Sequence, residues 1–387
     1  MGMYDSRYGR GRDGSPMRLV LCAVGTVFCA GITVLLLITL LRGSGVSAAK
    51  VNTEGVNLGI MDKFDMAISN SVSNALDGVL TLQKVYWLPD DSSAAPKPNP
   101  DRAGKTDDPA KMKDILEDAR QRLFIEDMVF SEDTPILEGS EISYYLDDTI
   151  FSVTWKQTFD HCVYTLSEVK VGHPSQFRRF LSGGSYGSGV LYTASDMAES
   201  VNAVTAASGD YYSYRPGGTT VYGGEVVKVN GDNFDICFID EQGDLIFSRA
   251  KELSGKESVE AFVKENKIKF SLCFGPVLVE DGQACQIGLY PVGEGDRHFS
   301  RAAIGQQGKL HYVLATANLE RYYPETPTLQ QFAQNLSNLG IKKAYALDGG
   351  QTATLIANNE VINTVSYGNE RLISDIIYFA TAIPDGD

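Results

Sequence analysis

A carboxylate and two glycines follow an apolar run in the segment "ALDGGQTAT" (Ala346–Thr354). The run before Asp348 predicts a β-strand, and polar residues continue the chain after the glycines. Because Gly349 and Gly350 lack a Cβ, their backbone N–H groups can approach an anion closely. A strand end of this kind is suited to present a carboxylate and bare amide groups to a ligand.

Four further segments combine apolar strand patterns with glycine and charged or aromatic residues. They are "ASGDYYSYRPGG" (Ala207–Gly218), "SLCFGPVLVEDGQ" (Ser271–Gln283), "SRAAIGQQGKLHYVL" (Ser300–Leu314) and "YGNERLISDIIYF" (Tyr367–Phe379). Taken alone, each has a structural explanation as a turn, a bulge or a loop tip. A functional interpretation therefore depends on the set and on its order along the chain.

Taken together and in order, the five segments resemble the phosphodiester glycosidase family over about Val163–Phe379, more than half of the chain. The family has five ordered motifs: a strand ending in Asn-Gly-Asp and two aromatic residues, a Phe-Gly-Pro-x-Leu-Val stretch, an Arg-x-Ala-Ile-Gly strand, a Leu-Asp-Gly-Gly turn and a closing Glu-Arg-x-x-Ser-Asp. The matching residues here are Ser208–Tyr212, Phe274–Val279, Arg301–Gly305, Leu347–Gly350 with Thr352–Thr354, and Glu370, Arg371, Ser374 and Asp375.

Three departures from the family pattern accompany this resemblance. The family's Asp-Gly-Arg is replaced by "VLATANLER" (Val313–Arg321), its Asn by Ser208, and its Gly-Ser-Ser by Gln351–Ala353. Two functions therefore stay open. The first is hydrolysis of a glycosyl-1-phosphodiester bond in a cell-envelope glycan. The second is non-catalytic glycan binding or exopolysaccharide assembly on the same fold.

The resemblance implies cleavage of a sugar from a phosphodiester, and glycoside hydrolysis usually relies on two carboxylates. Asp210 and Asp348 are the predicted catalytic pair, because each follows an apolar strand beside glycine. A phosphate leaving group is already acidic, so a general acid matters less than for an ordinary glycoside. The resemblance thus implies that the carboxylates stabilise the developing charge of the sugar and direct a water molecule or an enzyme nucleophile at the anomeric carbon, with the retaining or inverting course left open.

Substrate-binding residues are predicted around this pair. Arginine holds phosphate through bidentate hydrogen bonds, glycine amides approach anions, hydroxyl groups donate hydrogen bonds, and tyrosine stacks on a sugar ring. The residues predicted for these roles are Arg301, Arg371, Gly349, Gly350, Thr352, Glu370, Tyr211 and Tyr212. No cofactor is expected, and no metal: the four histidines are scattered, and no calcium-loop spacing is present.

The elements that must position these residues are mostly short strands. From Ser140 onward the pattern alternates strands and turns, with hairpins predicted at Asp147-Asp148, Asn230-Gly231 and Gln242-Gly243. Helices are predicted near Ser195–Asn202 and at Thr328–Leu339, where Thr328 and Gln331 form a capping box. The predicted fold class is α+β, with mostly antiparallel sheets and a few packing helices, preceded by one N-terminal transmembrane helix.

The transmembrane prediction comes from Leu19–Leu41, an uncharged segment between Arg18 and Arg42. About 20 apolar residues span a bilayer core as a helix, and the arginines before it place the N-terminus in the cytoplasm. A cleaved signal peptide is the alternative, with a small-residue site near Val46–Lys50. Either way, the main domain is expected outside the cell, as a single-pass membrane protein or a released one.

Between the membrane segment and the domain, Met61–Leu82 has helical apolar spacing, and Asp90–Asp108 is a Pro-rich linker. The helix packs on the domain, lies on the membrane or pairs with a second chain, which would make a homo-oligomer; a structural or sensory membrane protein is a third hypothesis. A further helix is expected at Pro109–Leu123. The predicted organisation is a cytoplasmic tail (1–18), the transmembrane helix (19–41), a juxtamembrane helical region with the linker (42–139) and a phosphodiester glycosidase-like domain (140–384).

Composition limits the partners. The formal net charge of −15 argues against a nucleic-acid partner, and 43% hydrophobic with 21% charged residues is typical of a globular protein. The expected partner is a phosphodiester-linked glycan or an anionic cell-envelope polymer. The exported cysteines lack a CxxC pair and are interpreted as buried free thiols, with disulfides as the alternative that their even number permits: Cys162, Cys237, Cys273 and Cys285.

Overall fold

The computed structural model describes residues 86–89, 94–210, 212–291 and 295–384. The segments Leu19–Leu41 and Met61–Leu82 and the residue Tyr211 lie outside the described residues, so the predictions made for them stay predictions. Within the described ranges, no helix has the length and apolar character needed to cross a bilayer. These residues belong to one compact unit, Val85–Asp387.

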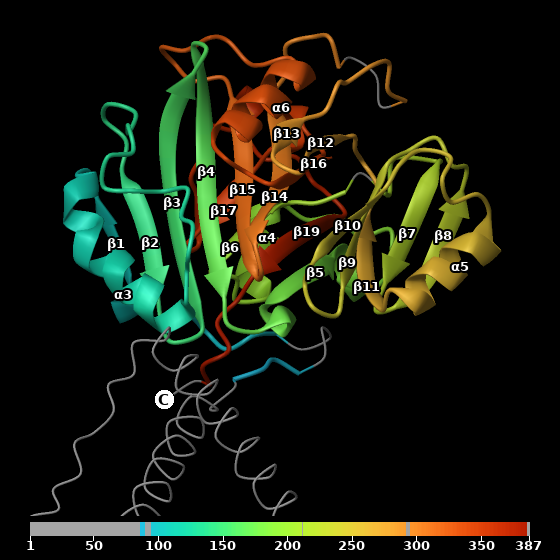
Figure 1. Ribbon diagram of the computed structural model, residues 1–387, viewed down its shortest axis with the longest axis horizontal. Coiled ribbons are helices and arrows are strands. Elements are labelled where there is room, and N and C mark those ends of the chain that lie inside the picture. Colours follow the sequence, from blue (N-terminus) through green and yellow to red (C-terminus); the bar gives the residue numbers. More distant parts are fainter. Residues whose placement is uncertain (1–85, 90–93, 211, 292–294, 385–387) are drawn as a thin grey trace, which may run out of the picture. The chain divides into compact units, whose positions relative to one another are not determined.

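Antiparallel sheets dominate the unit, which confirms the predicted α+β class. The largest is a nine-stranded sheet whose centre is formed by long strands (Figure 1). Its order is β1 (Ala103–Thr106), β2 (Ile142–Leu146), β3 (Ile150–Phe159), β4 (Cys162–Val171), β15 (His311–Asn318), β14 (Arg301–Gly308), β16 (Lys343–Leu347), β12 (Val277–Glu280) and β13 (Gln283–Ala284).

Three smaller sheets complete the β structure of the described residues. The five-stranded sheet has the order β18 (Glu360–Val361), β17 (Leu355–Ala357), β6 (Thr205–Ser208), β19 (Asp375–Phe379) and β5 (Phe177–Leu181). The three-stranded sheet contains β10 (Leu245–Ser248), β9 (Ile236–Asp240) and β11 (Ile268–Leu272), and the two-stranded sheet contains β7 (Gly218–Tyr222) and β8 (Glu225–Asn230).

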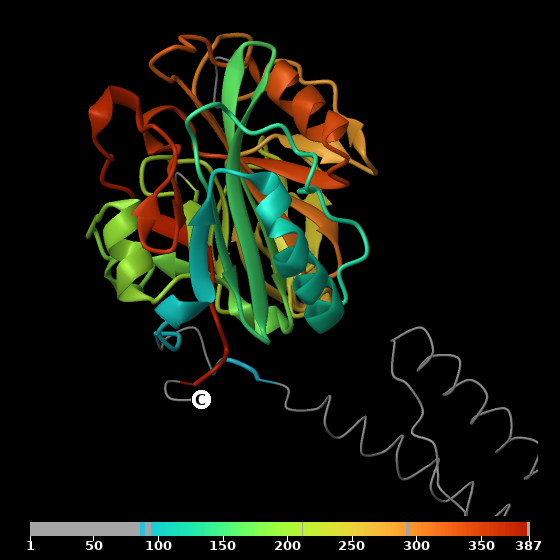
Figure 2. The ribbon, with the colours of Figure 1, turned by 90° about the vertical axis from the view of Figure 1, so that its left-hand side faces the viewer.

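In the described part of the chain, α-helices pack against these sheets at α3 (Lys113–Leu123), α4 (Ala194–Ser200), α5 (Lys256–Glu265) and α6 (Leu329–Asn338). Helices α3 and α6 cover one face of the nine-stranded sheet (Figure 2), where Leu116 and Phe332 join Trp155 in one buried cluster. The opposite face packs on the five- and three-stranded sheets. Helix α4 covers the outer side of the five-stranded sheet through Met197 and Ala198.

Short 3₁₀ turns connect several of these elements: η1 (Pro100–Arg102), η2 (Pro109–Met112), η3 (Pro174–Gln176), η4 (Ser182–Gly184), η5 (Gly350–Thr352) and η6 (Ser366–Gly368). The predicted helix Pro109–Leu123 begins as η2 and continues as α3. The capping box of α6 is present: the Thr328 hydroxyl accepts a hydrogen bond from the backbone N–H of Gln331 at 3.2 Å. Both local predictions are confirmed.

The hairpin predicted at Asp147-Asp148 joins β2 to β3. The Asp147 carboxylate fixes the turn, because Oδ1 accepts from the backbone N–H groups of Thr149 and Ile150 at 2.7 and 2.9 Å. The hairpin at Gln242-Gly243 joins β9 to β10 and is confirmed as well. These turns follow from residues close in sequence.

Asn230-Gly231 does not join two paired strands, so that hairpin prediction is wrong. β8 pairs with β7 instead, through a two-residue turn at Gly223 and Gly224, whose φ angles are +59° and +80°. Two consecutive residues with positive φ give the tight turn that matches strand twist.

The compact unit begins well before residue 140, where the sequence places the start of the domain. β1 pairs with β2, and α3 contributes Leu116, Ala119 and Leu123 to the core under the nine-stranded sheet. Burial of this apolar face favours docking of the helix on the sheet.

Candidate active site

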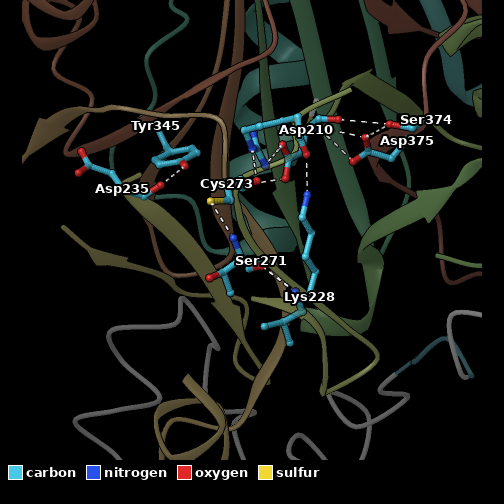
Figure 3. Close-up of polar contacts among 12 residues, drawn as sticks. Asp210, Lys228, Asp235, Ser271, Cys273, Tyr345, Ser374 and Asp375 are labelled. Carbon is cyan, nitrogen blue, oxygen red and sulfur yellow. Dashed lines mark hydrogen bonds and ion pairs between the residues drawn. The ribbon is translucent and has the colours of Figure 1, made fainter. Parts of the chain in front are cut away.

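The site lies where strands of three sheets end together. Asp348 follows β16 of the nine-stranded sheet, Asp210 follows β6, and Asp375 opens β19 beside it. Cys273 follows β11 of the three-stranded sheet and lies next to Asp210 (Figure 3). Backbone hydrogen bonds join the strand ends: Asp348 N–H donates to the Gly209 carbonyl at 3.2 Å, and Gly209 N–H donates to the Asp375 carbonyl at 3.1 Å.

Gly209 is required by the close approach of Asp375. A Cβ at position 209 would lie 2.3 Å from Asp375 Oδ2, closer than any ordinary contact. The neighbouring backbone N–H of Asp210 donates to both carboxylate oxygens of Asp375 at 3.1 Å. The glycine therefore lets a buried carboxylate bind directly to the backbone that carries Asp210.

Asp210 is buried, with 3% of its surface exposed, and its carboxylate contacts protein groups at both oxygens. Oδ2 accepts from the backbone N–H of Cys273 at 3.0 Å, and Arg179 Nη2 lies 3.7 Å away. Oδ1 forms an ion pair with Arg215 Nη2 at 2.9 Å. Both carboxylate oxygens of Asp210 are thus engaged inside the protein, and its predicted catalytic role stays a prediction.

Arg179 and Arg215 balance the two buried carboxylates. Arg179 Nε donates to Asp375 Oδ2 at 2.8 Å, and its Nη1 donates to the Ser271 carbonyl. Burial lowers the pKa of each arginine, but the nearby carboxylates raise it by more. Asp375 and Asp210 raise the pKa of Arg179, and Asp210 raises the pKa of Arg215. A low-dielectric interior holds such charges only when they are paired.

Burial raises the pKa of Asp375 to about 6, while the positive charge of Arg179 acts in the opposite direction. Each buried carboxylate of this cluster lies against an arginine, Asp375 against Arg179 and Asp210 against Arg215. Lys228 adds a cation at the edge, where its Nζ donates to the Arg215 carbonyl at 2.6 Å (Figure 3). The Cys273 thiol stays protonated at neutral pH, because burial raises its pKa to about 11.

Asp348 differs from the other two carboxylates in being partly exposed. Burial of its carboxyl group raises its pKa to about 7, and the charges of Asp210 and Asp375 act in the same direction. The Thr352 side chain and the charge of Arg371 act in the opposite direction and limit this rise. Near pH 7 a carboxyl group with this pKa exchanges a proton readily, which is the property that general acid–base catalysis needs.

The turn after Asp348 is held by its own hydrogen bonds. The Thr352 hydroxyl donates to the Gly349 carbonyl at 2.5 Å, and Gly350 N–H donates to the Ser300 carbonyl at 2.7 Å. A Cβ at position 349 would lie 2.6 Å from that same carbonyl oxygen. The prediction that the Gly350 amide binds an anion is therefore wrong, because Ser300 already accepts its hydrogen.

Arg371 lies near enough to Asp348 for its charge to lower the pKa of that carboxyl group, and its side chain is partly exposed. Its guanidinium carbon lies 4.7 Å from the centre of the Tyr214 ring, and the Tyr214 hydroxyl donates to the Leu372 carbonyl at 3.3 Å. Glu370 points to helix α4 instead, where its carboxylate accepts from Ser195 N–H at 3.0 Å and from the Ser195 hydroxyl. Arg371 thus combines partial exposure with nearness to Asp348, and Glu370 fixes the start of a helix.

Two predicted binding residues point elsewhere. Arg301 donates to the carbonyls of Arg297 and Pro327 at 2.6 and 3.4 Å, and its guanidinium lies over Phe299. The ring of Tyr212 is buried between side chains, with Tyr186 stacked at 5.2 Å and the Arg179 guanidinium at 5.6 Å. These contacts are with the protein, and substrate binding by Arg301 and Tyr212 stays a prediction.

Arg179, Arg215 and Cys273 are site residues that sequence reasoning missed, and Asp375 was matched to a motif without a role. A usable signal was the pair Arg178-Arg179 inside the apolar strand β5, because a charge in a buried strand needs a partner. In the part of the chain that the structure describes, no group of three or more His, Cys, Asp or Glu side chains is arranged to hold a metal ion.

Comparison with known proteins identifies one family. The phosphodiester glycosidase family model matches residues 201–380, as the order of the motifs predicts. One similar solved structure is the catalytic domain of zebrafish N-acetylglucosamine-1-phosphodiester alpha-N-acetylglucosaminidase, auto-inhibited by its pro-peptide. The two sequences are 16% identical, the match covers 64% of this chain and 85% of that chain, and the TM-score is 0.47. A hypothetical protein from Synechocystis has 14% identity, 64% coverage of both chains and a TM-score of 0.44. No curated protein sequence matches significantly.

Proposed function

We propose that the chain hydrolyses a glycosyl-1-phosphodiester bond, because residues 201–380 match the phosphodiester glycosidase family model. The proposed substrate is a cell-envelope glycan, and the proposed protein is anchored in the membrane by Leu19–Leu41 with its domain outside the cell. The observation that carries the proposed reaction is the state of Asp348: partly exposed, beside Arg371 and with a pKa of about 7.

In the proposed reaction Asp348 acts as a general base. It takes a proton from a water molecule while the water oxygen forms a bond to the anomeric carbon of the sugar. The bond from that carbon to the phosphate oxygen breaks, and the electron pair leaves with the phosphate monoester. Because this leaving group is a weak base, no second carboxylic acid has to protonate it.

The remaining residues support this step. Arg371 holds the phosphate, since a guanidinium binds phosphate oxygens in a forked geometry. Asp210 and Asp375, neutralised by Arg179 and Arg215, fix the strand end that carries Asp348, and their charges contribute to its raised pKa. Their role is positioning.

The test is hydrolysis of an N-acetylglucosamine-1-phosphodiester, with other sugars in parallel, by the purified full-length chain and its Asp348→Asn variant. We expect turnover by the wild-type protein and loss of at least 100-fold in the variant, as is typical for a general base. The matched control is Asp127→Asn, which removes an exposed carboxylate paired with Lys342 at 3.2 Å. Equal rates for Asp348→Asn and the control would refute the role of Asp348.

A non-catalytic glycan-binding protein is the second candidate, and one observation favours it. Most glycoside hydrolases use two free carboxylates, whereas both oxygens of Asp210 contact protein groups. This candidate predicts glycan binding that survives Asp348→Ala, weakens with Arg371→Ala, and is accompanied by no turnover on any sugar-1-phosphodiester.

A further inference from the structure

A buried arginine of the candidate active site has one nitrogen that no protein group binds. Arg215 is 7% exposed, and its Nη1 makes no hydrogen bond within the described part of the chain. The neighbouring Nη2 lies 2.9 Å from Asp210 Oδ1. Buried donors almost always have an acceptor, because a buried polar group without one costs free energy. The Nη1 of Arg215 is therefore a buried donor that a ligand can use.

The rest of the Arg215 side chain is held in place by the protein. Its Nε donates to the Gly217 carbonyl at 3.0 Å, and its guanidinium carbon lies 5.1 Å from the centre of the Phe234 ring. A Cβ at position 218 would come within 3.0 Å of the Arg215 Nε, so only glycine allows this close packing. A side chain that is already fixed loses little entropy on binding a ligand. Arg215 thus has the properties of a preformed anion-binding group.

Lys228 adds a second cation at the same position. Its Nζ donates to the Arg215 carbonyl at 2.6 Å, and Figure 3 shows its side chain extending toward Asp210. Burial lowers the pKa of Lys228, and the charge of Arg215 lowers it further. A bound anion would relieve this repulsion between the two cations. Because Lys228 is partly exposed, an anion can approach the pair from the solvent.

Tyr186 also borders this cluster on the solvent side. Its partly exposed ring stacks on the buried Tyr212 ring with centres 5.2 Å apart. Burial raises the pKa of Tyr186, and the charges of Asp210 and Arg215 act on it in opposite directions, which places its hydroxyl group near both. Access to Arg215 therefore passes between residues that are themselves able to donate hydrogen bonds.

Positive charge exceeds negative charge in this inner part of the site. Its charged side chains among the described residues are three cations and two carboxylates: Arg179, Arg215, Lys228, Asp210 and Asp375. Arg179 lies against both carboxylates, so the surplus positive charge belongs to Arg215 and Lys228. Low-dielectric surroundings strengthen the attraction between such a surplus and an anion.

Arg371 provides a separate cationic position. It lies near Asp348 and stacks on the Tyr214 ring at 4.7 Å, whereas Arg215 stacks on Phe234. A phosphodiester carries one negative charge, so the proposed reaction needs only one of these two positions. The position at Arg215 then suits a second anionic group on the same ligand.

The two cationic positions are close enough to serve one ligand. The Asp348 N–H donates to the Gly209 carbonyl at 3.2 Å, and the residue after Gly209, Asp210, contacts Arg215 directly. Burial raises the pKa of Asp348, and the charge of Asp210 adds to this rise. A ligand whose reacting bond lies beside Asp348 is therefore expected to extend to Arg215.

We propose that Arg215 and Lys228 bind an acidic group on the sugar ring, a carboxylate or a phosphate. The substrate class is then a 1-phosphodiester of an acidic sugar, such as a uronic acid or a phosphorylated sugar. The bond that is broken rests on the proposed function, whereas binding of an acidic sugar by Arg215 and Lys228 does not.

The test measures binding by calorimetry in the full-length Asp348→Asn chain, where the proposed turnover is removed. Each neutral sugar 1-phosphate is compared with the uronic acid 1-phosphate that differs from it only at C6, in glucose, galactose and mannose series. The corresponding 1,6-bisphosphates test a phosphate in place of the carboxylate. We expect the acidic member of at least one pair to bind at least about tenfold more tightly, as for one charge-assisted hydrogen bond.

Two variants in this background test the assignment to residues. Arg215→Lys keeps a positive charge beside Asp210 but removes the two terminal nitrogens of the guanidinium, and Lys228→Gln removes a partly exposed cation. Each should lower the ratio of acidic to neutral affinity by about threefold to tenfold. Lys264→Gln is the matched control, because it removes an exposed lysine of α5, and its ratio should stay that of the parent. If Arg215→Lys does not fold, Lys228→Gln decides.

Absence of tighter binding by every acidic ligand, or a ratio that the folded variants leave unchanged, overturns the proposal. A loss that is equal for acidic and neutral ligands would assign the 1-phosphate itself to Arg215 and overturns it as well. The proposed function is judged separately, by turnover of neutral and acidic 1-phosphodiesters in the wild-type chain. No turnover, together with a ratio that falls in the variants, refutes the hydrolase and leaves the acidic-sugar site standing.

Discussion

Asp348→Asn should stabilise the protein above pH 7. In the unfolded chain this carboxyl group ionises near its ordinary pKa of 3.8, whereas in the folded state its pKa is about 7. Between these values the folded state binds the extra proton, so stability falls as pH rises. One pKa unit corresponds to about 1.4 kcal/mol, so the whole shift gives roughly 4 kcal/mol. Because Asp348 is partly exposed, solvent reduces this free energy, and we expect a loss of roughly 2 kcal/mol in the free energy of unfolding.

Asparagine has nearly the shape of aspartate and does not ionise, so the variant does not lose stability as the pH rises through the pKa of Asp348. The measurement is urea unfolding of both proteins at pH 4.5 and at pH 8. The stability difference in favour of Asp348→Asn should widen by roughly 2 kcal/mol between the two pH values.

The control Asp127→Asn removes a carboxylate that water surrounds, since its side chain is 68% exposed. It should show no comparable widening. A stability difference for Asp348→Asn that is the same at pH 4.5 and pH 8 would refute the argument that burial raises the pKa of Asp348, and with it the assignment of this residue as a base near neutral pH.

Three further predictions concern the same region. If Asp348 is the base, kcat/KM should rise about tenfold per pH unit up to pH 7 and then level off; a fall above pH 7 would make Asp348 an acid instead. Gly209→Ala should lower the free energy of unfolding by about 2 kcal/mol, because the added Cβ meets Asp375. In the control Gly308→Ala no atom lies within 4 Å of the added Cβ, so its thermal unfolding should change little. Glu370→Gln should lower stability by about 1 kcal/mol through the start of α4 and leave kcat unchanged; a large loss of kcat would show a substrate contact.

The parts of the fold that the sequence predicts well are those with local signals. Helix α6 follows from Thr328 and Gln331, three residues apart, and the β2–β3 turn follows from Asp147, which binds its own neighbours. Asn230-Gly231 shows the limit of such signals, because strand pairing also depends on which partner is available. The Gly223-Gly224 turn offers β8 a closer partner, β7.

The candidate site was predictable as a location but not in its details. The order of the motifs indicated that Asp210 and Asp348 lie near each other. It could not indicate that Arg215 and Arg179 neutralise Asp210, because these contacts depend on side chains from a loop and a separate strand. For the same reason the sequence could not indicate that the Arg301 guanidinium donates to the carbonyl of Arg297, which residue type and spacing do not reveal.

The bond between Arg179 and Asp375 joins residues 196 positions apart, which affects how the chain reaches its folded state. Contacts of such long separation must wait for a large loop to close, and proteins rich in them fold slowly. During synthesis, Arg179 leaves the ribosome long before strand β19 exists to receive it. An intermediate without β19 would bury this arginine away from its carboxylate partner at a high cost. Formation of β19 is therefore expected to complete the folding of this site. A chain shortened before Asp375 is expected to remain a substrate for proteases.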